Sequence, residues 1–253
     1  MSDPLFSIIT ITRNNASGLK LTAKSISVQQ QFTNFEWLVI DGASTDNTAE
    51  IVGEYATENT VFISEPDQGI YNAMNKGIDR ATGKYLWFLN AGDCLSDAYI
   101  LRDVSKQIQY NMAPDFIYGD ARENGRIKKA HDASRFAWGQ FTHHQAMMYR
   151  RNMIAELRYD QTYPIAADYA FTLQVLARAK KLFYYPRVLC DFLGGGISEL
   201  QAIEARWENY YIRRDLLHMN PVKNKIIFHL NSLTHFLKTR LPFVYRLARI
   251  SAR

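Results

Sequence analysis

Polar and acidic residues collect at four points of the first hundred residues, each directly after a short apolar run. These clusters are residues 12–15, 41–44, 65–69 and 90–93. If the apolar runs are parallel strands of one sheet, their carboxyl ends meet at one edge, where ligands bind. Asp93 ends the fourth cluster, and a carboxylate at such a place can hold a divalent cation that neutralises a diphosphate. The pattern therefore favours metal-bridged binding of a nucleotide in a single cleft.

The elements that must position these clusters alternate between strand and helix. Strands are expected over residues 5–12, 35–40, 61–64 and 85–89, and helices over residues 18–30, 44–55 and 70–80. This order predicts an α/β fold with a mainly parallel sheet and helices on both of its faces. No loop has the glycine spacing of a dinucleotide-binding turn or a P-loop, which disfavours an NAD enzyme and a P-loop NTPase.

Composition excludes several classes of protein. The chain has 253 residues, of which 47% are hydrophobic and 22% charged, so it is neither disordered, collagen-like nor a coiled coil. Cys94 and Cys190 lie far apart, which argues against a disulfide framework and a cysteine zinc site. No segment resembles an export signal or a membrane span of roughly 20 apolar residues. We expect a cytoplasmic protein, soluble or peripheral to a membrane.

Four motifs in a fixed order make the sequence recognisable. They are residues 7–14, 36–48, 64–77 and 88–93. Together they resemble the family 2 glycosyltransferases, enzymes with a GT-A fold, over about residues 5–200. Within that family the chain is most similar to the bacterial exopolysaccharide enzymes of the colanic acid WcaE type. The resemblance implies a metal-dependent, inverting enzyme that transfers a sugar from a nucleotide-sugar, such as a UDP- or GDP-sugar.

The resemblance also divides the chain. The glycosyltransferase domain would be residues 1–198, with a nucleotide-sugar half over residues 1–95 and an acceptor half over residues 96–198. Residues 199–253 would be a helical extension.

Residues at the strand ends would bind the donor. The resemblance implies donor contacts by Thr10, Thr12, Arg13, Asp41, Glu65, Asp67, Asn75, Lys76, Asn90 and His144. Asp41 would accept hydrogen bonds from the base or ribose, although an aspartate before a glycine is also a common turn residue. Asn75 and Lys76 would approach the diphosphate or the sugar, but a solvated helix face has the same appearance.

Residues 90–93 occupy the position of the family's DxD metal motif but read Asn-Ala-Gly-Asp. Asp93 is therefore the one anionic ligand that remains. Mn²⁺ or Mg²⁺ commonly uses one or two carboxylates together with substrate phosphates and water, so Asp93 is chemically sufficient. Affinity for the cation should be low before the donor binds. The alternative is that Asp93 only caps the following helix.

The family's general base is the aspartate of an acidic pair at the start of a helix, and Asp168 matches it, with Ala167 in place of the usual glutamate. In inverting transfer this carboxylate takes the proton of the acceptor hydroxyl as that hydroxyl attacks the sugar. A helix over residues 164–178 also gives Asp168 the position of a capping carboxylate, and one residue can do both. A strand is expected over residues 142–151, with His143 and His144 at its start; His144 would touch phosphate, metal or acceptor, or be structural.

The carboxyl-terminal region is basic. No acidic residue follows Asp215, and residues 216–253 carry seven basic side chains. A helix over residues 199–220 is followed by an apolar stripe at Ile226, Leu230, Leu233 and Leu237. Such a helix is typical of an anionic membrane surface. Packing on the body of the protein, or in a homodimer, is the alternative; nucleic acid is disfavoured because no nucleic-acid module accompanies the charge.

Three functions compete. The favoured one is transfer of a sugar to a lipid-linked oligosaccharide acceptor at the inner face of the plasma membrane. In that function the glycines of residues 194–196 would contact the diphosphate or act as hinges of a lid. The second is a catalytically silent nucleotide-sugar-binding scaffold, favoured by the altered DxD motif. The third, a nucleotidyltransferase, is weakened because its glycine-rich, basic first loop is missing.

Overall fold

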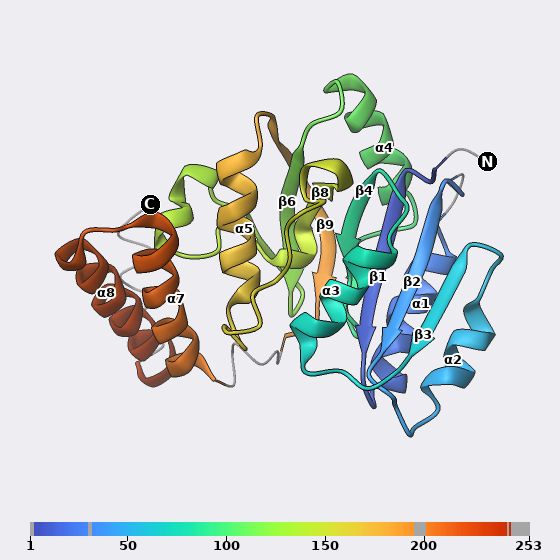
Figure 1. The fold of residues 1–253 in the computed structure, drawn as a ribbon, viewed down its shortest axis with the longest axis horizontal. Helices are drawn as coiled ribbons and strands as arrows, with labels where there is room; N and C mark the ends of the chain where they lie inside the picture. Colours follow the sequence, from blue (N-terminus) through green and yellow to red (C-terminus); the bar gives the residue numbers. More distant parts are fainter. Residues whose placement is uncertain (1–2, 30–31, 195–200, 242, 244–253) are drawn as a thin grey trace.

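The β-branched run that opens the chain forms β1 (Phe6–Thr12), and all seven of its residues are buried. Three further strands join it in the order β3-β2-β1-β4, and all three pairings are parallel. These strands are β2 (Phe35–Asp41), β3 (Thr60–Ser64) and β4 (Tyr85–Phe88). The connecting helices are α1 (Ala16–Ser27), α2 (Thr48–Tyr55) and α3 (Ile70–Arg80). The computed structural model describes residues 3–29, 32–194, 201–241 and 243 (Figure 1).

The second half of the sheet mixes strand directions. Its strands are β5 (Cys94–Leu95), β6 (Phe116–Glu123), β7 (Arg126–Lys128), β8 (Met147–Arg150) and β9 (Leu182–Phe192). β8 lies antiparallel between β4 and β6, and β9 runs parallel to β6 and antiparallel to β5. Within the described residues the sheet has nine strands, with β7 attached to β6 as a hairpin. The predicted α/β class is confirmed, and the first four strands form the part of the sheet in which every pairing is parallel.

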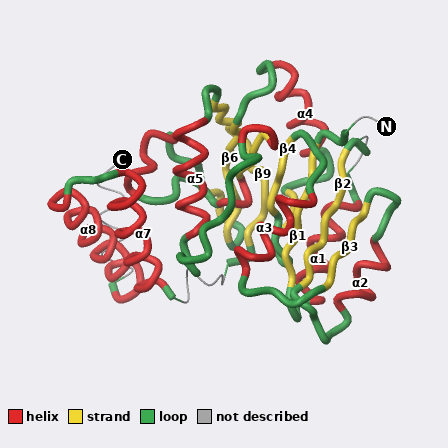
Figure 2. Tube along the Cα trace, in the orientation of Figure 1, coloured by secondary structure: helices red, strands yellow, loops and turns green. Residues whose placement is uncertain are grey.

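Two helical layers cover the sheet, because successive strand residues point to opposite faces. Ile8 and Trp87 belong to the core under α1, α2 and α4 (Ile100–Tyr110). Ile9 and Phe88 belong to the core under α3 and α5 (Ala167–Arg178). Figure 2 shows the strands gathered between these helices. The arrangement brings the loops after β1 and β4 to the same edge as the first turns of α3 and α5.

Two helices extend the molecule beyond α5. They are α7 (Ala202–Leu217) and α8 (Pro221–Arg240), which pack on each other at the end of the molecule opposite β3 (Figure 1). Ile212 of α7 is fully buried against Ala166, Tyr169 and Leu173 of the α5 segment. The predicted helices of this region are confirmed. Of the expected glycine loop only Gly194 is described, and the basic segment after Phe243 also lies outside the described residues.

The strand expected over residues 142–151 is shorter than predicted. His144–Ala146 form a 3-10 turn, and the strand begins at Met147. The Trp87 indole donates to the Gln145 carbonyl oxygen at 2.7 Å, and the Gln145 side chain donates to Asp93. These two bonds hold Gln145 toward the loop after β4, so the backbone at this residue forms a turn and does not pair with a neighbouring strand.

Candidate active site

A cavity of about 690 Å³ opens at the carboxyl ends of β1 and β4. Its volume lies within the range of small-molecule sites. The predicted site residues that line it are Thr12, Arg13, Asp67, Asn90, Asp93, His144 and Asp168. The cavity therefore brings Asp93 and Asp168, 75 positions apart in the chain, to one space.

Asp93 sits in a tight loop after β4 that Thr22 of α1 holds in place. The Thr22 hydroxyl accepts from the Gly92 amide at 2.9 Å and donates to the Asp93 carbonyl at 2.7 Å. Gly92 has a φ of +110°, which favours glycine at this turn. The Asp93 side chain accepts a hydrogen bond from Gln145 Nε2 at 2.9 Å. Burial raises the pKa of Asp93 to about 7, because desolvation outweighs the bonds to its carboxylate.

Four side-chain atoms of the cavity lining are buried without a hydrogen-bond partner. They are Thr12 Oγ1, Asn90 Oδ1, Gln140 Oε1 and His144 Nε2. Buried polar atoms in proteins are almost always paired, because an unpaired one costs about 1–3 kcal/mol. Several such atoms around one cavity indicate that a polar ligand supplies the missing partners.

Asp168 lies in the first turn of α5, where three groups approach its carboxylate. Gln140 Nε2 donates to Oδ2 at 3.2 Å, and the Tyr169 amide donates to Oδ1 at 2.9 Å. The Tyr71 hydroxyl lies 3.3 Å from Oδ1 and 2.7 Å from the Ile165 carbonyl oxygen. Burial, with the negative charge of Asp168 second, raises the pKa of Tyr71 far above its ordinary value, so Tyr71 remains a hydrogen-bond donor.

The two histidines of the cavity are neutral near pH 7. Burial lowers the pKa of His143 and of His144. The His143 ring packs on Phe192 with the ring centres 4.7 Å apart, and His144 packs on Phe88 at 5.8 Å. A neutral imidazole with a free ring nitrogen can bind a metal or a hydrogen-bond partner, and His144 Nε2 is such a nitrogen.

Two predicted donor-binding residues lie away from the cavity with their side chains occupied. Thr10 is fully buried, and its hydroxyl accepts from Trp37 Nε1 at 3.0 Å. Asn75 donates to the Tyr159 carbonyl at 2.9 Å and accepts from the Tyr159 amide at 2.8 Å. These bonds join the polar atoms of Thr10 and Asn75 to other parts of the protein, and the donor contacts expected of both residues stay predictions.

Asp41 and Lys76 also lie outside the cavity lining. Asp41 is 2% exposed and accepts from the Ser44 amide and from the Ser44 and Ser64 hydroxyls, which agrees with a turn residue. Lys76 Nζ lies 2.6 Å from Asp67 Oδ1 and 2.9 Å from Glu65 Oε1. Its charge is thus neutralised within the protein by two carboxylates, and its approach to the diphosphate or the sugar stays a prediction.

Gln140, Gln145 and Tyr71 are cavity residues that the sequence did not single out as site residues. Gln140 lies in an irregular connection where no periodic pattern marks it. Tyr71 lies inside the motif of residues 64–77, and Gln145 directly follows His144, which was chosen. Their importance follows from contacts to Asp168 and Asp93 across the sheet edge, which sequence spacing does not reveal.

The fold and the position of the cavity indicate the class of protein. A parallel first half, a mixed second half and a polar cavity at the strand ends make up a GT-A-like α/β fold. A family model of glycosyl transferase family 2 matches residues 7–178, and the chain belongs to that family.

Known proteins agree with this assignment. A PGL/p-HBAD biosynthesis glycosyltransferase of Mycobacterium bovis is 35% identical over 207 residues, covering 78% of this chain and 80% of the relative. The crystal structure of S. aureus TarS 1-349 in complex with UDP superposes with a TM-score of 0.67 at 18% identity, covering 93% of this chain and 72% of that one. The mannosyltransferase PcManGT from Pyrobaculum calidifontis, in complex with GDP-Man and Mn²⁺, gives a TM-score of 0.67 at 17% identity, covering 99% and 74%.

Proposed function

We propose that this chain transfers a sugar from a UDP- or GDP-sugar to an acceptor hydroxyl with inversion at the anomeric carbon. The observation that carries the proposal is the shared cavity: Asp93 and Asp168 both line it, together with four unpartnered polar atoms. A donor diphosphate on the Asp93 side and an acceptor hydroxyl at Asp168 would leave the sugar between them. The solved structures with UDP and with GDP-Man support the choice of donor class.

The donor set of the cavity suits a hard cation that arrives with the diphosphate. In the part of the chain that the structure describes, no three His, Cys, Asp or Glu residues form a metal cluster. Asp93 would be the anionic ligand of the cation. Asn90 Oδ1 and His144 Nε2, which have no hydrogen-bond partner and line the same cavity, would be neutral ligands. Mn²⁺ or Mg²⁺ bound there, with phosphate oxygens completing its coordination, would stabilise the charge of the leaving diphosphate.

Asp168 would act as general base. Its Oδ2 accepts from Gln140 and its Oδ1 from the Tyr169 amide, so two amide N–H donors hold the carboxylate in one orientation. In the transfer step the acceptor oxygen forms a bond to the anomeric carbon, the bond to the diphosphate breaks, and the acceptor proton passes to Asp168. Gln140 Oε1, buried and unpartnered, would accept a hydrogen bond from a substrate hydroxyl.

A donor panel tests this function. UDP- and GDP-sugars are incubated with the protein, Mn²⁺ and candidate acceptors, and nucleoside diphosphate release is measured. One donor should turn over, and Asp168→Asn should abolish turnover while leaving donor binding intact, because Asp168 lies on the acceptor side. Glu156→Gln, an exposed carboxylate in the connection before α5, is the matched control. Tight donor binding by the wild type without turnover of any donor would favour the silent scaffold.

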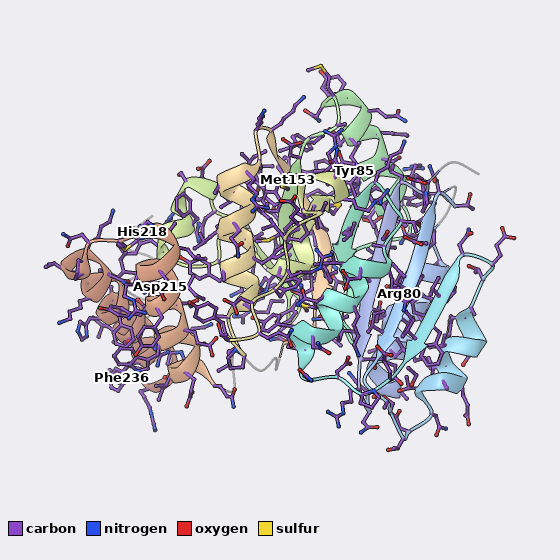
Figure 3. All side chains as sticks on the ribbon, in the orientation of Figure 1. Arg80, Tyr85, Met153, Asp215, His218 and Phe236 are labelled. Carbon is purple, nitrogen blue, oxygen red and sulfur yellow. The ribbon has the colours of Figure 1, made fainter. Side chains whose placement is uncertain are left out.

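The acceptor would be lipid-linked, because α8 offers a membrane surface. Val222, Ile226, Leu230 and Leu233 recur on one side of α8 and are 67%, 52%, 44% and 53% exposed. Phe236, labelled in Figure 3, is 52% exposed. The helix contains no acidic residue and several basic ones, which complements anionic lipid headgroups. Within the described part of the chain, no helix combines the length and apolar character needed to cross a bilayer.

This proposal puts the enzyme at the inner face of the plasma membrane, in exopolysaccharide synthesis of the colanic acid kind. Sedimentation with vesicles tests the membrane step. Vesicles containing anionic lipid should carry the wild type down, vesicles of neutral lipid should not, and a Leu230→Asp, Leu233→Asp variant should stay in solution. Tyr110→Asp, which changes an aromatic side chain 85% exposed on α4, is the control. A homodimer in solution that the double variant disrupts, without vesicle binding, would identify a second copy as the partner of α8.

A further inference from the structure

We propose that Glu208 of α7 is a positioning residue for Asp168, an inference that rests on the proposed role of Asp168 as base. Glu208 Oε2 accepts hydrogen bonds from the Ala166 amide at 2.7 Å and from the Ile165 amide at 3.0 Å. These two amides immediately precede α5, and Asp168 is its second residue. A carboxylate from the carboxyl-terminal helices therefore holds the backbone segment that carries the base.

The residue before α5 supplies no side-chain cap, although Asp168 within the first turn accepts from the Tyr169 amide. The first amides of a helix lack partners within the helix, and a Ser, Thr, Asp or Asn before it normally supplies one. Here the N-cap is Ala166, which makes no side-chain bond, and the first helical residue is Ala167. Glu208 supplies an acceptor from a distant part of the chain to the Ala166 and Ile165 amides, the last two before the helix. Its negative charge at a helix amino terminus is favourable.

The same segment is held from its other side by α3. The Tyr71 hydroxyl lies 2.7 Å from the Ile165 carbonyl oxygen. Ile165 is thus bonded through its amide to α7 and through its carbonyl to α3, three residues before Asp168. Glu208 does not line the cavity, so it acts on substrate only through the position of Asp168.

A buried arginine keeps α7 fixed to its neighbours. Arg213 is 1% exposed, and its Nε donates to Asn224 Oδ1 of α8 at 2.7 Å. Asn224 in turn donates to the Tyr210 carbonyl of α7 at 2.9 Å. Beside it, Ile212 is fully buried against α5. Because α7 is clamped between α5 and α8, the Glu208 carboxylate is held at the start of α5 with little freedom.

The test compares Glu208→Ala, Glu208→Gln and the wild type. Glu204→Ala is the matched control, since Glu204 is an exposed glutamate one turn earlier on the same helix. The first readout needs no activity: hydrogen exchange of a peptide that includes the Ile165 and Ala166 amides. Exchange should be faster in Glu208→Ala and unchanged in Glu204→Ala, because only the former loses the acceptor of these amides.

The second readout is the split between kcat and the KM for the donor. Glu208→Ala should lower kcat by about 10- to 100-fold, the effect expected for a catalytic group displaced by about 1 Å. The donor KM should stay within about twofold, because the donor side of the cavity is not touched. Glu208→Gln keeps an acceptor oxygen and the size of the side chain, so its kcat should lie between those of the wild type and Glu208→Ala.

The two failures are distinguishable. A wild type that turns over no donor would refute the proposed function. Unchanged hydrogen exchange in Glu208→Ala, or a kcat equal to that of Glu204→Ala, would refute the positioning role. A parallel loss of kcat and donor affinity would also refute it, since that result indicates general disruption. If Glu208→Ala does not fold, Glu208→Leu, which also lacks an acceptor oxygen, is measured by the same two readouts, and wild-type values in both refute the role.

Discussion

Replacing Asp93 by asparagine should make the cation-free protein more stable at alkaline pH. The ordinary pKa of this side chain is 3.8, and burial raises that of Asp93 to about 7. Between these pH values the folded chain holds a proton at Asp93 that the unfolded chain has released. The free energy of unfolding therefore decreases as pH rises from about 4 to about 7. Above that range it is lower by the full cost of burying the charged carboxylate.

The size of the effect follows from the shift. A rise from 3.8 to about 7 is roughly 3 pKa units, and at about 1.4 kcal/mol per unit it corresponds to about 4 kcal/mol. Asparagine carries no charge, and its Oδ1 can still accept the hydrogen bond from Gln145 that Asp93 Oδ2 accepts in the wild type. We expect Asp93→Asn to exceed the wild type by about 4 kcal/mol at pH 8 and to equal it near pH 4.

Urea unfolding of both proteins in EDTA, followed by circular dichroism from pH 4 to pH 8, measures the difference. Asp103→Asn is the control of opposite sign. Burial acts on Asp103 too, but hydrogen bonds from Arg187 and Arg102 outweigh it and lower its pKa. This variant should be less stable than the wild type at pH 8 and approach it only below about pH 4. An Asp93→Asn difference that does not change with pH, or that is destabilising at pH 8, would refute the assignment of a buried, unpaired charge.

Three further outcomes are expected. Asn75→Ala should lower the free energy of unfolding by about 2 kcal/mol in urea titrations, because both bonds to the Tyr159 backbone are lost; an unchanged midpoint would contradict this. Gly77→Ala should be destabilising by about 1–3 kcal/mol in the same assay, since its Cβ would lie 2.5 Å from Ile9 Cγ2, and a more stable variant would show that helix propensity outweighs the clash. Chelation with EDTA should suppress sugar transfer and added Mn²⁺ should restore it; full activity in EDTA would exclude a dissociable cation from the reaction.

The sequence predicted those elements whose pattern is local. The helix α3 (Ile70–Arg80) has the predicted bounds, since its apolar spacing and flanking residues lie within the element itself. The two-residue β5 (Cys94–Leu95) was missed, because it exists only through its pairing with β9. The direction of strands in the second half of the sheet was likewise set by partners far away in the chain.

In the candidate site, too, local sequence motifs identified some residues, whereas contacts between distant residues were not predictable. Motif position identified Asp93 and Asp168 as candidates, and the structure brings both to one cavity. Motif position did not reveal that Asn75 is bonded to the Tyr159 backbone, because its partner is 84 residues away. Gln140 was not predicted for the same reason: its bond to Asp168 joins an irregular connection to a helix. Residue type tells what a side chain can do, whereas its partner decides whether that group is free to bind a ligand.

The pairing of β5 with β9 bears on the order in which the chain can fold during synthesis. The first four strands of the sheet end at Phe88, so this parallel part can form while later residues are still being translated. The strand that follows the Asp93 loop must wait about 100 residues for its partner, and the start of α5 waits for Glu208. A nascent chain halted before α7 would hold the folded parallel part of the sheet, while the segment that carries Asp168 still lacks its bonds to Glu208. Such pairing between distant residues is typical of slow folding.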